Sequence, residues 1–175
     1  MSLLWFLKSA GSLLIMGSST MAGFAFSRRL TERIENIRQI QAFLMELENE
    51  IVYINRPLGQ ALLAISHKKG MMSSFAKRVF EIQNNTKLST GKAWEKSLDE
   101  FRAQWVLHQE EWDLMISMGY VLGKTNRAGQ KSCIELVRSK LGIQEKKAEN
   151  DRAQKEKLYK SLGVLGGIAT VLVLI

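Results

Sequence analysis

The sequence contains one proline and one cysteine among its 175 residues. Because Cys133 is the single cysteine, an intrachain disulfide is excluded, and the fold does not depend on an oxidising compartment. A disulfide between two copies through Cys133 stays open. The β-favouring runs and frequent turn residues that typify sheet proteins are also missing. The sequence therefore predicts an all-α fold.

Charge is almost absent from both ends of the chain. Over Leu3–Phe26 the single charged side chain is Lys8, and Ser161–Ile175 has none. The other 24 Lys and Arg residues and all 17 Asp and Glu residues fall within Arg28–Lys160. A helix that spans a bilayer needs about 20 mostly apolar residues. We therefore expect an N-terminal transmembrane helix, a helical domain and a C-terminal transmembrane helix at residues 1–27, 28–157 and 158–175.

Basic residues beside the first apolar segment predict its orientation. A secretory signal peptide carries its positive charges before the apolar core, whereas Arg28 and Arg29 follow it here. By the positive-inside rule the C-terminal side of this helix lies in the cytoplasm. The central domain is then cytoplasmic, and both termini lie across the membrane.

The second apolar segment is shorter than the first. Its 15 uncharged residues extend about 22 Å as a helix, less than the ~30 Å hydrocarbon core. A buried core helix or a re-entrant segment is therefore an alternative to a full span. Gly163 and Gly167 form a small-xxx-small pair, which lets membrane helices approach closely. We name these two glycines as candidate packing residues of a membrane helix.

Apolar residues of the central domain recur every three or four positions, which is the period of an α-helix. Turn and capping residues divide the domain into six helices. The first continues the N-terminal membrane helix. The others begin near Pro57, Ser73 or Ser74, Ser89 or Thr90, His108 and Asn126. The first, second, third and fifth helices end at about Ile54, Lys69-Gly70, Asn84-Asn85 and Leu122-Gly123. Short connections favour an antiparallel bundle in which the first and last helices lie side by side.

The predicted core is the apolar face of each of these helices. On the first helix the face comprises Leu30, Ile34, Ile37, Leu44, Leu47, Ile51 and Ile54. On the next five helices it comprises Leu58, Ala61, Leu62 and Ile65, then Phe75, Val79 and Ile82, then Ala93, Trp94, Leu98, Phe101 and Trp105, then Trp112, Met115 and Met118, and finally Ile134, Val137 and Leu141.

Motifs that carry chemistry are missing. His67 and His108 lie 41 positions apart, and neither has a cysteine or acid at metal-ligand spacing. Phosphate-binding glycine loops do not occur. The sequence therefore predicts no enzyme activity, no catalytic residue, no cofactor and no metal site. If the protein uses nucleotide energy, a partner supplies it.

What remains for function is surface. Glu46, Glu48 and Glu50 form an acidic edge on the first helix, and we name them as candidate partner-binding residues. The segment Arg28–Lys160 has a net charge of +7, from 24 basic and 17 acidic residues. This excess fits the positive-inside rule, because the basic residues are densest beside the apolar ends. A nucleic-acid-binding surface is the alternative interpretation.

Several stretches together resemble the stage III sporulation protein AB family of endospore-forming bacteria. They are RIENIRQIQAFLMELENEIVYINRPLGQALLAIS at Arg33–Ser66, Ala93-Trp94-Glu95 with Leu98, Gly119–Gln130, and the junction Lys160–Gly163 before the apolar tail. No single motif is specific, but their order and spacing match the family over nearly the whole chain.

The resemblance implies a fold similar to the cytoplasmic domain of type II secretion F platform proteins. It implies residence in the mother-cell membrane around the forespore, in a secretion-like channel joining the two cells. The implied partners are other stage III sporulation channel proteins, including a secretion-type ATPase, and the lipid bilayer. It also allows a homo-oligomer, and nucleic acid is not expected.

The resulting hypothesis is a non-enzymatic membrane platform or adaptor that couples a cytoplasmic ATPase to the membrane complex. Two alternatives remain. One is a membrane-anchored nucleic-acid-binding helical protein, for which the +7 charge is the motivation, and the other is a membrane enzyme whose site leaves no sequence motif.

Overall fold

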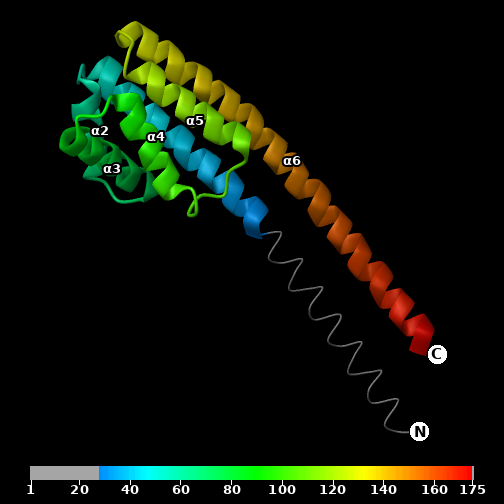
Figure 1. Cartoon of the computed structure of the whole chain (residues 1–175). Helices are drawn as coiled ribbons and strands as arrows, with labels where there is room; N and C mark the ends of the chain where they lie inside the picture. The colour runs from blue at the N-terminus through cyan, green and yellow to red at the C-terminus, as the bar shows by residue number, and fades with distance from the viewer. Residues whose placement is uncertain (1–27, 175) are drawn as a thin grey trace. The chain divides into compact units, whose positions relative to one another are not determined.

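A computed structural model describes residues 28–174, with side chains for residues 28–155 and for Leu158. The described chain is all-α, and its six helices confirm the predicted fold class. Residues 33–147 form one compact unit, the bundle, and the flanking residues belong to a second unit. The helices (Figure 1) are residues 28–48 continuing into the π-helical turn η1 (Asn49–Tyr53), α2 (Leu58–Ser66), α3 (Met71–Thr86), α4 (Thr90–Phe101), α5 (Gln109–Leu122) and α6 (Arg127–Leu174).

The predicted membrane segments are covered only in part. Residues 1–27 lie outside the described residues, and residues 158–174 are described as helix without side chains, Leu158 excepted. Within the described part of the chain, no helix is both long enough and apolar enough to span a bilayer. The two transmembrane helices therefore stay predictions.

The first helix is buried more widely than its predicted stripe. Ile40 and Phe43, which the prediction missed, join the core because neighbouring helices contact this helix on more than one side. At its end Ile54 was predicted inward but is 46% exposed. Its backbone N–H bonds the Asn49 carbonyl at 3.0 Å, five residues back. This π-turn rotates the last residues out of the α-helical register. Leu30 is half-buried.

Two predicted helix boundaries are wrong. Gly70 was expected to end the second helix, but α2 ends at Ser66 and Gly70 is the N-cap of α3. Its φ of 130° is a conformation that glycine adopts without steric cost, so the residue serves the turn and not a C-cap. The third helix was expected to begin near Ser73 or Ser74, but α3 begins at Met71, so Ser73 is buried inside the helix.

Other terminal signals were read correctly. The Asn126 side-chain oxygen accepts a hydrogen bond from the Gly129 N–H at 2.9 Å, as an N-cap should. Gly123 is the C-cap of α5, and Ser89 is the N-cap of α4. Trp105 is buried as predicted, but it lies in the loop after α4, which ends at Phe101.

Aromatic residues join α3 and α4 to the first helix at the centre of the core. The Phe75 ring meets Trp94 edge-on with centroids 4.9 Å apart, and Phe43 contacts both rings. On its other side Trp94 packs against α5 at Gly119. A Cβ atom added to Gly119 would lie 2.5 Å from the Trp94 Cγ atom, so only glycine allows this approach.

Hydrogen bonds place the first helix beside α6 within the bundle. Glu145 of α6 accepts from Arg38 at 2.6 Å and from Gln41 at 2.7 Å. Arg138 of α6 donates to Glu48 at 3.0 Å. These bonds confirm the predicted pairing of the first and last helices. The chain therefore enters and leaves the bundle at the same end, which we call the terminal end.

A buried ion pair closes the same end. The Arg33 guanidinium bonds one Glu111 oxygen at 2.5 Å, and the other oxygen accepts from the His108 backbone N–H at 2.5 Å. The Arg33 and Glu111 side chains are 3% and 0% exposed. Glu111 lies in the first turn of α5, where an acid favours the helix dipole. Its burial against a residue 78 positions away was not predicted.

We expect Gly119→Ala to destabilise the bundle by about 1–3 kcal/mol, because the added methyl group overlaps the Trp94 indole. Gly142→Ala is the matched control, since nothing lies within 4 Å of its added Cβ. In a helix interior that change should stabilise by about 0.5–1 kcal/mol. Chemical unfolding followed by circular dichroism measures both values. Equal effects of the two substitutions would contradict the close packing.

We expect Arg33→Met to lower the free energy of unfolding by about 3–5 kcal/mol, because it leaves a buried carboxylate without its cation. Arg33→Met combined with Glu111→Leu should recover most of this loss. The double variant still lacks the bond to the His108 N–H, which costs about 1 kcal/mol. The same unfolding assay tests both. A double variant as unstable as the single one would show that an uncompensated charge is not the cause.

Candidate interaction surfaces

The acidic edge predicted on the first helix is neutralised pair by pair. Glu46 pairs with Lys68 beyond the end of α2. Glu48 is 7% exposed and pairs with Arg138 of α6, and Glu50 pairs with Arg56 at 2.5 Å. The hydrogen bond to Glu46, and then its charge, raise the pKa of the Lys68 ammonium. The three carboxylates thus bind cations of the chain itself and present little free negative charge.

Two of these acids line an open groove. Glu46 and Glu48 share a cavity of about 580 Å³ with the exposed side chains of Met45 and Tyr53, whereas Glu50 lies outside it. A second groove of about 560 Å³ runs between the first helix and the connection from α2 to α3. Its lining includes Phe43, Glu46, Ile65, Lys69, Gly70 and Met71. Both are wide surface depressions.

The candidate membrane-packing residues, Gly163 and Gly167, belong to α6, and their surroundings lie outside the described residues. In the part of the chain described with side chains, no three His, Cys, Asp or Glu residues gather to hold a metal ion. His67 is an exposed C-cap of α2, and His108 is the N-cap of α5. Cys133 packs half-buried against the core, and burial raises the pKa of its thiol.

A basic surface that the sequence reading missed lies at the other end of the bundle. Here the α3–α4 and α5–α6 connections meet, because Thr90 packs under Gly123. A Cβ atom added to Gly123 would lie 2.9 Å from the Thr90 Cβ atom. The Gln83 amide also donates to the Thr90 hydroxyl at 2.9 Å, which ties in the end of α3. We call this surface the basic end, and its exposed cations are Lys87, Lys92, Lys124 and Arg127.

The basic end joins two acid-free segments of the sequence. Residues 82–94 and residues 114–134 contain no Asp or Glu. The nearest acid of α4, Glu95, accepts a hydrogen bond from the Tyr120 hydroxyl at 2.5 Å and forms no ion pair among the described residues. That hydrogen bond, and then burial, raise the pKa of Tyr120. Acid-free runs are visible in a sequence, but only the fold shows which of them meet.

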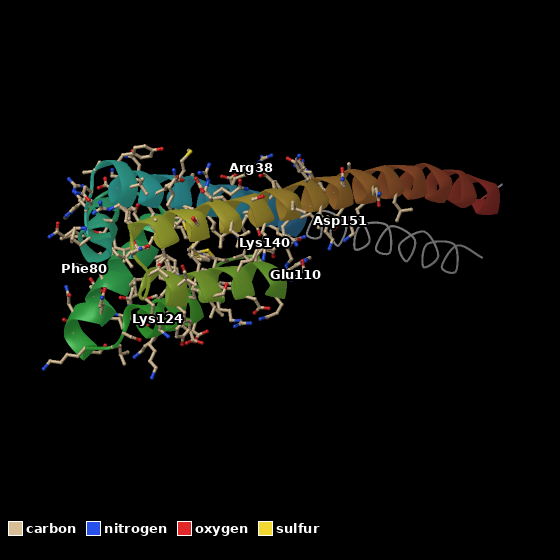
Figure 2. The ribbon with its side chains drawn as sticks, turned by 90° about the horizontal axis from the view of Figure 1, so that it is seen from above. Arg38, Phe80, Glu110, Lys124, Lys140 and Asp151 are labelled. Carbon is tan, nitrogen blue, oxygen red and sulfur yellow. The ribbon has the colours of Figure 1, made fainter. Side chains whose placement is uncertain are left out.

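Figure 2 shows Glu110 and Lys124 near opposite ends of α5. Glu110 accepts from Gln144 of α6 near the Arg33–Glu111 pair, at the terminal end. Lys124 follows the C-terminus of α5, at the basic end. The two ends of the bundle thus differ in character. One closes with paired charges, and the other displays cations.

Comparison with known proteins identifies the family. The model of the family Stage III sporulation protein AB (spore_III_AB) matches residues 8–175. The chain is 34% identical over 169 residues to the "Stage III sporulation protein AB" of Bacillus subtilis (strain 168), covering 96% of this chain and 99% of that protein.

A solved structure of "Stage III sporulation protein AB (SpoIIIAB)" superposes with a TM-score of 0.62 and 28% sequence identity. The match covers 70% of this chain and 98% of that one. Sequence and fold therefore agree, and the chain belongs to the Stage III sporulation protein AB family.

Proposed function

We propose that the protein is a non-enzymatic platform of a sporulation channel, anchored in the membrane at both ends. One observation supports the proposal most directly. The chain enters and leaves the bundle at the same end, where Arg38 and Gln41 donate hydrogen bonds to Glu145. The two apolar segments at residues 1–27 and 158–175 continue the chain from that end. A bundle built in this way is suited to hang from a bilayer by two helices.

Charge supports a cytoplasmic position for the bundle. Arg28 and Arg29 follow the first apolar segment, and Lys155, Lys157 and Lys160 precede the second. Basic residues that flank membrane helices stay on the cytoplasmic side. In a sporulating cell the membrane would be the mother-cell membrane around the forespore, as the family implies.

The role of the bundle would be coupling. Family membership implies that the partners are other stage III sporulation channel proteins, among them a secretion-type ATPase. The sequence has no phosphate-binding glycine loop of its own, so hydrolysis would belong to the ATPase. The bundle would transmit that motor's binding or movement to the membrane complex, with no cofactor or metal. Several copies would form one platform if the protein is a homo-oligomer.

One observation favours the alternative of a membrane-anchored nucleic-acid-binding protein, and it is the unpaired cations of the basic end. Such binding would weaken steeply as salt rises, because the phosphates release condensed counterions. Absence of binding to single-stranded or duplex DNA and to RNA at low salt would remove this alternative.

We expect the two predicted membrane helices to place both termini outside the cytoplasm. Cysteines introduced at Ser2, Asn85 and Ile175, each in a Cys133→Ser background, report this through a membrane-impermeant maleimide. In vegetative cells that express the protein in the plasma membrane, the Ser2 and Ile175 variants should react without permeabilisation. The Asn85 variant should react only after permeabilisation, which also shows that its cysteine is reactive. Labelling of Asn85 in intact cells would invert the orientation. An unlabelled Ile175 would reduce the C-terminal segment to a docked helix.

We expect the full-length chain in lipid nanodiscs to bind the purified secretion-type ATPase of the same organism. An unrelated membrane-anchored helical bundle of similar net charge is the control. Surface-immobilised nanodiscs and a titration of the ATPase give the dissociation constant. If the ATPase does not bind at about 100 μM, which corresponds to about −5.5 kcal/mol, the coupling role is wrong.

A further inference from the structure

Other exposed lysines of the bundle, such as Lys69, Lys96 and Lys140, also lack an ion pair among the described residues. The cations of the basic end differ because four of them gather where two acid-free segments meet. Residues 51–80 also contain no acid, yet most of their cations are neutralised by other segments. Arg56 pairs with Glu50 and Lys68 with Glu46, while Arg78 forms two bonds to Glu100 at 2.5 and 2.8 Å. An acid-free run therefore does not by itself create a positive surface.

At the basic end no such neutralisation occurs. Among the described residues, none of the cations Lys87, Lys92, Lys124 and Arg127 takes part in an ion pair. All four side chains are exposed. Lys131 is excluded from the set because it lies 3.8 Å from Glu135. Four unpaired cations on and beside two adjoining connections form a positive patch that can steer and hold a negatively charged partner.

The membrane is a poor candidate for that partner. The 14 residues of α5 separate the basic end from the terminal end by about 20 Å at 1.5 Å per residue. An anionic lipid surface acts over about a Debye length, roughly 8 Å at physiological salt. A bilayer that holds the chain by the terminal end is thus too distant to saturate these cations.

Nucleic acid is also disfavoured by the side chains of this surface. Proteins that bind single strands combine cations with exposed aromatic rings on which bases stack. On the two acid-free segments Trp94 is fully buried, and Tyr120 is half-buried with its hydroxyl on Glu95. The exposed large apolar residue there is Val121, one turn before Lys124 and 36% exposed. An aliphatic contact with a polar rim is typical of a protein interface.

We infer that the basic end, formed by Lys87, Lys92, Lys124 and Arg127, docks an acidic protein surface of the cytoplasmic ATPase. The inference rests on the proposed function. It assigns a negatively charged surface to the ATPase and assigns the residues that bind that surface to this chain. Electrostatic docking of this kind chiefly accelerates association and selects the partner. It also gives an affinity that falls as salt rises.

The test compares two charge-matched variants of the full-length chain in nanodiscs. Lys92→Glu/Lys124→Glu/Arg127→Glu reverses the basic end, and Lys87 is left unchanged because its φ of 53° is strained for most side chains. Lys140→Glu/Lys146→Glu/Lys147→Glu is the control, with three exposed lysines reversed elsewhere on α6. The purified ATPase is the probe, titrated at low and at physiological salt. Circular dichroism and thermal unfolding check the fold of both variants.

We expect the basic-end variant to bind the ATPase about tenfold more weakly or worse, and the control variant to stay within about twofold of the unaltered chain. The salt dependence of binding should also flatten in the basic-end variant alone. If that variant does not fold, Lys92→Gln/Lys124→Gln/Arg127→Gln replaces it, with a smaller loss in the same direction.

Three other results would overturn the inference. If the unaltered chain does not bind the ATPase, the proposed function fails and the inference fails with it. If the unaltered chain binds and the basic-end variant binds equally well, the inference alone fails. A fluorescent single strand of about 30 nucleotides is tested in parallel at low salt. If the basic-end variant loses that strand but keeps the ATPase, the surface is a nucleic-acid site.

Discussion

The contact of the Trp94 indole with the backbone of Gly119 is the constraint on which much of the bundle depends. It brings α4 and α5 so close that two further contacts follow along the same seam, Gly91 against Tyr120 and Thr90 against Gly123. The last contact joins the α3–α4 and α5–α6 connections. A side chain at position 119 would overlap the Trp94 indole, so α4 and α5 would have to move apart along this seam. Core packing and the proposed docking surface thus have one origin.

The terminal end is organised by charge instead. Arg33 and Glu111 are buried together, and taking both from water offsets most of their attraction. Such a pair adds little stability compared with an apolar replacement, but the two side chains can meet in only one arrangement of their helices. Its second carboxylate oxygen bonds the His108 N–H at the start of α5, so the pair fixes that helix against the first. With Arg38 on Glu145, it defines where the chain starts and leaves the bundle.

Sequence reasoning succeeded where a signal was local. Asn126 caps α6 because a short polar side chain before a helical pattern satisfies a free N–H, whatever surrounds it. It failed where two residues far apart decide the outcome. The pairing of Glu111 with Arg33 lies in no local pattern, and neither does the π-turn that turns Ile54 outward. Gly70 could end one helix or begin the next, and only its place in the fold decides which. The sequence analysis also missed the basic end, because its cations come from segments that lie far apart in the sequence.

The +7 charge of Arg28–Lys160 therefore has two different physical meanings within one domain. Where the fold pairs a cation with an acid, as it pairs Arg78 with Glu100, the positive charge is neutralised within the chain. Isolated surface pairs are worth about 0–1 kcal/mol, so leaving four cations unpaired costs the fold almost nothing. Under the proposed docking, these cations contribute to binding and not to the stability of the fold. The basic end lies opposite the end from which the apolar segments continue, so the proposed docking surface faces away from the proposed membrane anchors.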